Sequence, residues 1–201
     1  MSTAAAAIIL IFVISIFSST GNKSYRYPTT AGNPPPQIYQ TTVSSMETPA
    51  PNYLAEDVLP SITRYIQKYR DADLAQQIAD SIVRHSQTYN VNPKLVAALI
   101  ARESKFNPRA LSSSGAMGLG QLLPSTCKGL GVSDGFDIDE NAKGTVRYLK
   151  GLLDRFKKYE KQVQLALGGY LEGPNAVERQ LGYSDHTRAY VDDIISIYNK
   201  M

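Results

Sequence analysis

Apolar residues recur at helical spacing along most of the chain after residue 53. In one segment they lie four positions apart and the pattern ends at Asn90, and the next segment opens with Asn92 and Pro93. Asparagine followed by proline is typical of a helix N-cap and first turn. Both segments are therefore predicted to be helices. Their apolar residues are Leu74, Ile78, Ile82, Leu95, Val96, Leu99 and Ile100.

Three later segments continue the helical pattern. The clearest has an apolar stripe opposite a charged face. Another runs from about Gln162 to Leu171 and ends before Gly173 and Pro174, and the last runs from about Asp185 to Lys200. The stripe of the clearest segment consists of Ala142, Val146, Leu149, Leu153 and Phe156.

Two loops separate these helices, a Gly/Ser-rich loop over residues 112–120 and a second loop around residues 134–139. Alternating patterns typical of strands are weak throughout. The sequence therefore predicts a compact, mainly α domain over residues 53–201, with at most a small sheet.

The first 52 residues have a different composition. Residues 4–17 form an uncharged apolar run, which as a helix would be about 21 Å long, shorter than the ~30 Å hydrocarbon core of a membrane. We expect residues 1–19 to be a signal peptide, and an uncleaved membrane anchor remains an alternative because no basic residue precedes the run. Either would export the chain. Residues 20–52, rich in Pro, Ser and Thr, are predicted to be a linker.

Composition excludes several classes of function. The net charge is only +3, from 21 Lys+Arg and 18 Asp+Glu in 201 residues, so we expect no nucleic-acid partner. The single cysteine, Cys127, rules out an intrachain disulfide, and we expect it to be a buried small hydrophobe. His85 and His186 are not spaced as metal ligands, so we expect surface or capping roles for them, no metal site and no cofactor.

Glu103 is the residue most informative about chemistry. Apolar side chains precede it at spacings of three, four and seven residues, which places its carboxylate on the apolar stripe of its helix. Loss of water there raises a carboxyl pKa and favours a general acid. The alternative is that Glu103 merely ends its helix and pairs with Arg102, Lys105 or Arg109.

The neighbourhood of Glu103 resembles the catalytic domain of soluble lytic transglycosylases, a branch of the lysozyme-like superfamily related to goose-type lysozymes. The resemblance covers about residues 73–177. The matching segments are 91–108, 115–126, Phe136-Asp137, Glu140-Asn141, Gly144, Tyr148-Leu149, Ala166-Leu167, Tyr170 and Gly173-Pro174.

The resemblance implies an α+β lysozyme-like fold and a site built around Glu103 as the catalytic acid. It implies that the Tyr170 hydroxyl hydrogen-bonds this carboxylate, and that Tyr190 helps to close the site. The segment that includes Gly118 and Gln121 would line the sugar groove. The residues expected to support the site or bind substrate are Ser104, Met117, Gly118, Leu119, Gln121, Tyr170, Leu171 and Tyr190.

Three positions depart from the family motifs. Gly120 stands where the family has methionine, which would remove an apolar wall of the groove. Leu171 and Gly169 stand where the family has asparagine and alanine, and the asparagine's polar sugar contact would be lost. These departures put substrate affinity in doubt more than the chemistry.

The activity implied is cleavage of the MurNAc-β-1,4-GlcNAc bond of peptidoglycan, with formation of a 1,6-anhydro ring and without a cofactor. It would serve cell-wall remodelling or local opening of the wall. The expected partner is the glycan strand, and a cell-envelope or secretion assembly and the cytoplasmic membrane, through residues 4–17, remain open. The expected location is the cell envelope, in the periplasm or on the extracellular face.

Two alternatives remain at this stage. A hydrolytic muramidase like goose-type lysozyme needs a second carboxylate, and the sequence does not place any candidate in the cleft. A non-catalytic, secretion-associated glycan-binding module is the other, suggested by Gly120 and Leu171. The candidates for a second carboxylate are Asp134, Asp137, Asp139, Glu140 and Glu172.

Overall fold

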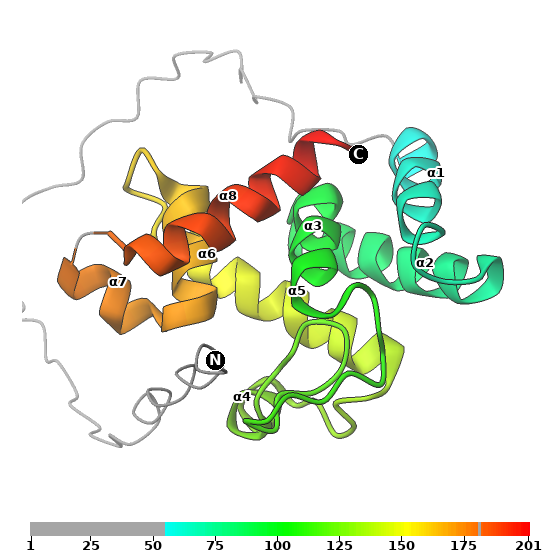
Figure 1. Ribbon diagram of the computed structural model, residues 1–201, viewed down its shortest axis with the longest axis horizontal. Coiled ribbons are helices and arrows are strands. Elements are labelled where there is room, and N and C mark those ends of the chain that lie inside the picture. The colour runs from blue at the N-terminus through cyan, green and yellow to red at the C-terminus, as the bar shows by residue number, and fades with distance from the viewer. Residues whose placement is uncertain (1–54, 181) are drawn as a thin grey trace, which may run out of the picture. The chain divides into compact units, whose positions relative to one another are not determined.

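The computed structural model describes residues 55–180 and 182–201, and these form eight helices joined by short connections and one long loop (Figure 1). The predicted signal peptide or anchor over residues 1–19 and the linker over residues 20–52 lie outside the described residues. The helices are α1 Ala55–Ile66, α2 Ala72–Tyr89, α3 Pro93–Ser104, α4 Pro124–Leu130, α5 Ile138–Arg155, α6 Gln162–Glu172, α7 Pro174–Gln180 and α8 Asp185–Asn199.

The mainly α fold predicted from the apolar spacing is confirmed, together with several helix ends. The side chain of Asn92 accepts a hydrogen bond from the Lys94 amide at 2.9 Å and Pro93 opens α3, as expected. Asn90 ends α2 in the left-handed conformation, with φ of 51°. Cys127 is buried on α4 as predicted.

Helices α1 and α7 were not predicted as separate elements. Helix α1 contains Pro60, a residue that usually interrupts a helix interior, and α7 has only 7 residues. At most a small sheet was expected, and the described residues contain two isolated bridges, in which Met117 pairs with Leu111 and with Leu122.

Helix α3 lies in the middle of the packed domain and contacts α1, α2, α5 and α8 (Figure 1). Its residues 95–101 are all buried, which makes it apolar on every side over these two turns. Only its last turn emerges from the core, and that turn carries Glu103. In the part of the chain that the structure describes, no helix is both long and apolar enough to cross a membrane.

Asp139 joins the start of α5 to the side of α2. One of its carboxylate oxygens accepts hydrogen bonds from Ser81, at 3.1 Å, and Arg84, and lies 2.7 Å from Nε2 of His85. His85 is only 9% exposed, so the expectation of a surface or capping histidine is wrong for this residue. It is buried because α2 packs along α5. His186 is exposed, as expected.

We predict that Asp139→Asn lowers the free energy of unfolding by about 1–2 kcal/mol at pH 7, because hydrogen bonds to a charged but half-exposed carboxylate are lost. The partners of Asp139, led by His85, outweigh its desolvation and hold its pKa below the ordinary 3.8. The stabilisation is therefore present above about pH 4 and is lost as the pH falls through the lowered folded-state pKa.

Urea denaturation of both proteins at pH 7 and at about pH 3 measures this difference. Asp154→Asn is the matched control, because Asp154 belongs to an exposed pair with Lys150 on one helix. Equal stability losses in the two variants at pH 7 would contradict the role given to Asp139.

Candidate active site

Glu103 occupies the last turn of α3, where the helix leaves the core. The three residues that precede it on the same face are fully buried, whereas Glu103 itself is half-buried, so its carboxylate lies at the border between core and solvent. The predicted position on the apolar stripe is confirmed. Those three residues are Val96, Leu99 and Ile100.

The surroundings of Glu103 raise its pKa from the ordinary 4.5 to about 7. Desolvation by the packed helices is the largest cause, since burial disfavours the charged form. The hydrogen bond from Tyr190 and the positive charge of Arg102 act in the opposite direction and lower the pKa. At neutral pH the carboxyl group is thus poised between its acid and base forms.

Tyr190 is the direct partner of Glu103. Its hydroxyl donates a hydrogen bond to Oε1 of Glu103 from α8, and its ring is buried, with 4% of its surface exposed. Arg102 lies over this ring, with its guanidinium carbon 5.3 Å from the ring centroid, and its Nε donates to Asp193 at 3.2 Å. Both contacts tie the last turn of α3 to α8.

The role expected for Tyr170 needs a correction. Its hydroxyl donates to the carbonyl oxygen of Gly120 at 2.8 Å, and the hydroxyl that donates to Glu103 is that of Tyr190. Tyr170 is still close enough for the charge of Glu103 to act on it, since burial first and then this charge raise the pKa of Tyr170. Its ring packs on Tyr148, with the ring centroids 5.0 Å apart. Tyr170 therefore secures the glycine-rich loop to α6.

A single amide group, that of Asn141 on α5, organises the glycine-rich loop. Asn141 is fully buried, and its Nδ2 donates to the carbonyl oxygens of Met117 at 3.0 Å and Gly135 at 2.7 Å. Its Oδ1 accepts from the amide of Gly120 at 2.8 Å. This role was not predicted, although Asn141 is a polar residue beside the apolar stripe of α5, a pattern that could have indicated it.

Two glycines of this loop are packed so closely against neighbouring residues that a side chain would not fit. A Cβ on Gly118 would lie 2.1 Å from the carbonyl oxygen of Gly135, and one on Gly120 would lie 1.9 Å from Oγ1 of Thr145. Gly118 also has φ of 70°, which side chains disfavour. A methionine at position 120 would therefore collide with the buried Thr145, which explains the glycine there by packing.

The other residues predicted to bind substrate differ in how accessible their side chains are. Leu119 is fully buried in the core, so the predicted substrate contact is wrong for it. The amide NH₂ of Gln121 donates to Gly118 at 3.0 Å and to Ala110 at 3.3 Å, which holds the loop. Met117 and Leu171 are half-buried and remain accessible in part.

The chain turns sharply after Ser104. Lys105 and Phe106 have φ of 50° and 59°, and each costs about 1–2 kcal/mol in this left-handed region. Ser104 helps to form the turn, because its Oγ accepts from the amide of Asn107 at 3.2 Å. Ser104 thus supports the end of the helix that carries Glu103.

Each candidate for a second carboxylate has a structural partner. Asp134 and Asp137 accept from nearby backbone amides, Asp139 binds α2, and Glu140 accepts from Ser133. Glu172 accepts from the side chains of Ser184 and Thr187 at the start of α8. Among the described residues no hydrogen bond links any of the five to Glu103, and no group of three or more metal-ligating residues occurs.

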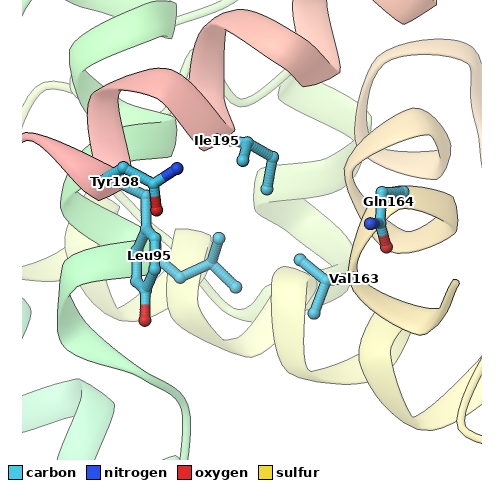
Figure 2. A pocket seen from close by; sticks show the side chains of 6 residues that line it. Leu95, Val163, Gln164, Ile195 and Tyr198 are labelled. Carbon is cyan, nitrogen blue, oxygen red and sulfur yellow. The ribbon is translucent and has the colours of Figure 1, made fainter.

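A separate pocket of about 290 Å³ lies between α3, α6 and α8 (Figure 2). Its walls are mostly apolar, and it contains none of the predicted site residues. It does not coincide with the chemistry described above. Its lining consists of Leu95, Val163, Gln164, Ile195, Tyr198 and Asn199.

Comparison with known proteins assigns the chain to a family of transglycosylase domains. The family model of the transglycosylase SLT domain matches residues 80–192, more than half of the chain. The chain belongs to the transglycosylase SLT domain family, and the resemblance seen in the sequence is confirmed.

Curated relatives carry corresponding names. The chain is 37% identical over 125 residues to a transglycosylase of Enterobacteria phage PRD1, a match that covers 62% of this chain and 44% of the relative. It is 38% identical over 81 residues to membrane-bound lytic murein transglycosylase F of Vibrio cholerae, covering 38% of this chain and 15% of that protein. The matches therefore span less than half of each relative's length.

Solved structures share the fold. An inactive mutant of the lytic transglycosylase Slt from Pseudomonas aeruginosa matches with a TM-score of 0.52 and 23% identity, over 73% of this chain and 28% of that one. The 70 kDa soluble lytic transglycosylase from Escherichia coli matches with a TM-score of 0.53 and 20% identity, over 73% and 29% of the two chains. The predicted fold class is thus confirmed.

We predict that Tyr190→Phe raises the pKa of the Glu103 carboxyl group above about 7, by about one unit, because the hydrogen bond that favours the charged form is lost while desolvation remains. Carbon NMR of protein labelled at glutamate carboxyls, assigned by comparison with Glu103→Gln, follows this titration directly. Tyr159→Phe, a change in a tyrosine packed on Phe156, is the control. A downward shift in Tyr190→Phe would contradict the geometry described.

Proposed function

We propose that this chain is a peptidoglycan lytic transglycosylase that cleaves the MurNAc-β-1,4-GlcNAc bond. The observation that carries the proposal is the half-buried Glu103, which has a pKa of about 7 and a hydrogen bond from Tyr190. Membership of the SLT family and the names of the PRD1 and Vibrio relatives support the same reaction.

In the first step, protonated Glu103 donates its proton to the oxygen that bridges the two sugars, and the bond from this oxygen to C1 of MurNAc breaks. The leaving sugar departs with a new hydroxyl group. The substrate's own N-acetyl group stabilises the positive charge that develops at C1, as in substrate-assisted glycosidases. The hydrogen bond from Tyr190 then stabilises the new Glu103 carboxylate.

In the second step, the Glu103 carboxylate accepts the proton of the C6 hydroxyl group of MurNAc. The C6 oxygen forms a bond with C1 and closes the 1,6-anhydro ring, while the N-acetyl group is released. Glu103 is protonated again, so no water is consumed and one carboxyl group performs both proton transfers. Its pKa near neutrality suits both roles.

Nothing in the described residues favours hydrolysis over this reaction. A hydrolytic muramidase uses a second carboxylate to activate water or to stabilise C1. All five candidates hold helix ends or loops in place. The case for a non-catalytic glycan-binding module is also weaker, because Gly120 is explained by its packing on Thr145.

The location follows from the substrate, because peptidoglycan lies outside the cytoplasmic membrane. We propose that the chain is exported to the cell envelope, with residues 1–19 as a signal peptide or an anchor in the cytoplasmic membrane. The Vibrio relative is named as membrane-bound, which supports an envelope location. Association with a cell-envelope or secretion assembly stays a prediction.

We predict that Glu103→Gln reduces release of soluble muropeptides from purified sacculi by at least about 10³-fold, because the amide cannot donate the proton. Mass spectrometry of the wild-type products is expected to show 1,6-anhydro ends, with no oxygen incorporated from ¹⁸O-labelled water. Glu160→Gln, a change of an exposed residue, is the matched control and is expected to retain activity. Reducing ends carrying ¹⁸O would establish hydrolysis instead.

The pH profile gives an independent prediction. Because kcat/KM reports groups of the free enzyme, it is expected to fall about tenfold per pH unit above about pH 7, as Glu103 loses its proton. The groups that face Glu103 are Tyr170, Tyr190 and Arg102, and the raised pKa values of both tyrosines keep them neutral in this range. Initial rates between pH 5 and 9 measure the profile, and a decline centred near 4.5 would contradict it.

A further inference from the structure

The turn that follows Glu103 is held from outside the segment that matches the SLT family. Nε of Arg70, in the connection between α1 and α2, donates to the carbonyl oxygen of Phe106 at 2.9 Å. Arg70 precedes residues 80–192, which the family model covers. The side chain of Arg70 is half-buried, so this hydrogen bond is partly shielded from water.

The end of α1 and the same connection also bury the ring of Phe106. Tyr65 and Tyr69 lie 6.3 Å and 5.9 Å from it by ring centroids, and 5.9 Å from each other. Phe106 has no exposed surface, whereas Tyr69 is 40% exposed and covers it from the solvent side. Aromatic packing and the Arg70 hydrogen bond therefore act on the same residue.

The turn needs such a restraint because its backbone conformation is unfavourable for the residues that form it. Lys105 and Phe106 are consecutive residues with positive φ, and neither is a glycine or an asparagine. Strained backbone of this kind persists only where the surroundings hold it. The hydrogen bond from Arg70 is one such restraint on the end of α3.

The turn also links Glu103 to the glycine-rich loop. After it, the amide of Ala110 donates to Asn107, and the carbonyl oxygen of Ala110 accepts from the amide of Gly118 at 2.8 Å and from the side chain of Gln121 at 3.3 Å. Glu103 and the loop are therefore joined through a short stretch that several hydrogen bonds hold. A movement of the turn would therefore shift the positions of the Glu103 carboxyl group and of the loop together.

We propose that Arg70 is a positioning residue for Glu103, because it holds the left-handed turn after Ser104 in place. It touches neither the substrate nor the reacting atoms and acts through Phe106. Helix α1 and its connection to α2 thus have a function in the site that the family segment alone does not supply. The inference rests on the proposed function only for its kinetic test.

The test uses Arg70→Met, which keeps an apolar stem and removes the donor. We expect kcat on purified glycan strands to fall about tenfold to a hundredfold through misplacement of the acid, with KM changed less than about twofold. Because the released carboxyl group gains water, its titration is expected to move from about 7 toward 4.5. Carboxyl NMR on the free protein measures this shift without any substrate.

The control is Arg147→Met. Arg147 likewise donates to a backbone carbonyl at a helix end, that of Leu130 at 2.5 Å, but the left-handed residue there is Gly131, for which this conformation carries no strain. Its loss is expected to lower the melting temperature about as much as Arg70→Met does. It is expected to leave kcat and the titration of Glu103 within about twofold and a few tenths of a pH unit.

A second-site variant tests the strain itself. Lys105→Gly adopts positive φ freely, so in the Arg70→Met background it is expected to restore most of kcat and of the raised pKa. If Arg70→Met changes the Glu103 titration no more than Arg147→Met does, or if Lys105→Gly restores nothing, the proposal is overturned. A wild-type protein that releases no muropeptide would refute the proposed function alone, since the titration still decides the role of Arg70.

Discussion

The pKa of the Glu103 carboxyl group depends on two opposing effects, the loss of water around it and the hydrogen bond that Tyr190 donates to it. The core behind it is apolar on all three preceding positions of the helix face, which favours the neutral acid. Tyr190 favours the charged form enough that both forms are accessible near neutrality. A fully buried acid without Tyr190 would hold its proton too tightly to give it away, and an exposed one would have lost it already.

Three helices from separate parts of the chain hold the groups around Glu103 in position. Helix α8 supplies Tyr190, α6 fixes the loop through Tyr170, and α5 fixes it through Asn141. The loop has little regular structure of its own, so it relies on these side chains to satisfy its buried carbonyl and amide groups. The Glu172 carboxylate, which binds the first turn of α8, contributes to the same alignment by joining α6 to α8.

The sequence predicted the helices because their apolar spacing and caps are local properties, as at Asn92 and Pro93 of α3. Apolar spacing also placed the Glu103 carboxylate on the apolar stripe, whereas its role as the catalytic acid was implied by the family resemblance. The sequence assigned the hydrogen bond to the wrong tyrosine, since nothing local distinguishes the direction of Tyr170 from that of Tyr190. The roles of Gly120 and Asn141 were missed because they depend on residues more than twenty positions away along the chain.

The distribution of the remaining acids agrees with the proposed reaction, in which one carboxylate serves twice. Asp139 and Glu172 each have several hydrogen-bond donors, which outweigh desolvation and hold the pKa of both carboxyl groups below their ordinary values. An acid held ionised by structural partners is a poor proton donor, and its lone pairs are already occupied. Among the acids of the described residues whose pKa is shifted, Glu103 has the opposite balance, so in the proposed reaction the second group comes from the substrate. An N-acetyl sugar carries such a group, which links the single carboxylate of the site to the chemistry of peptidoglycan.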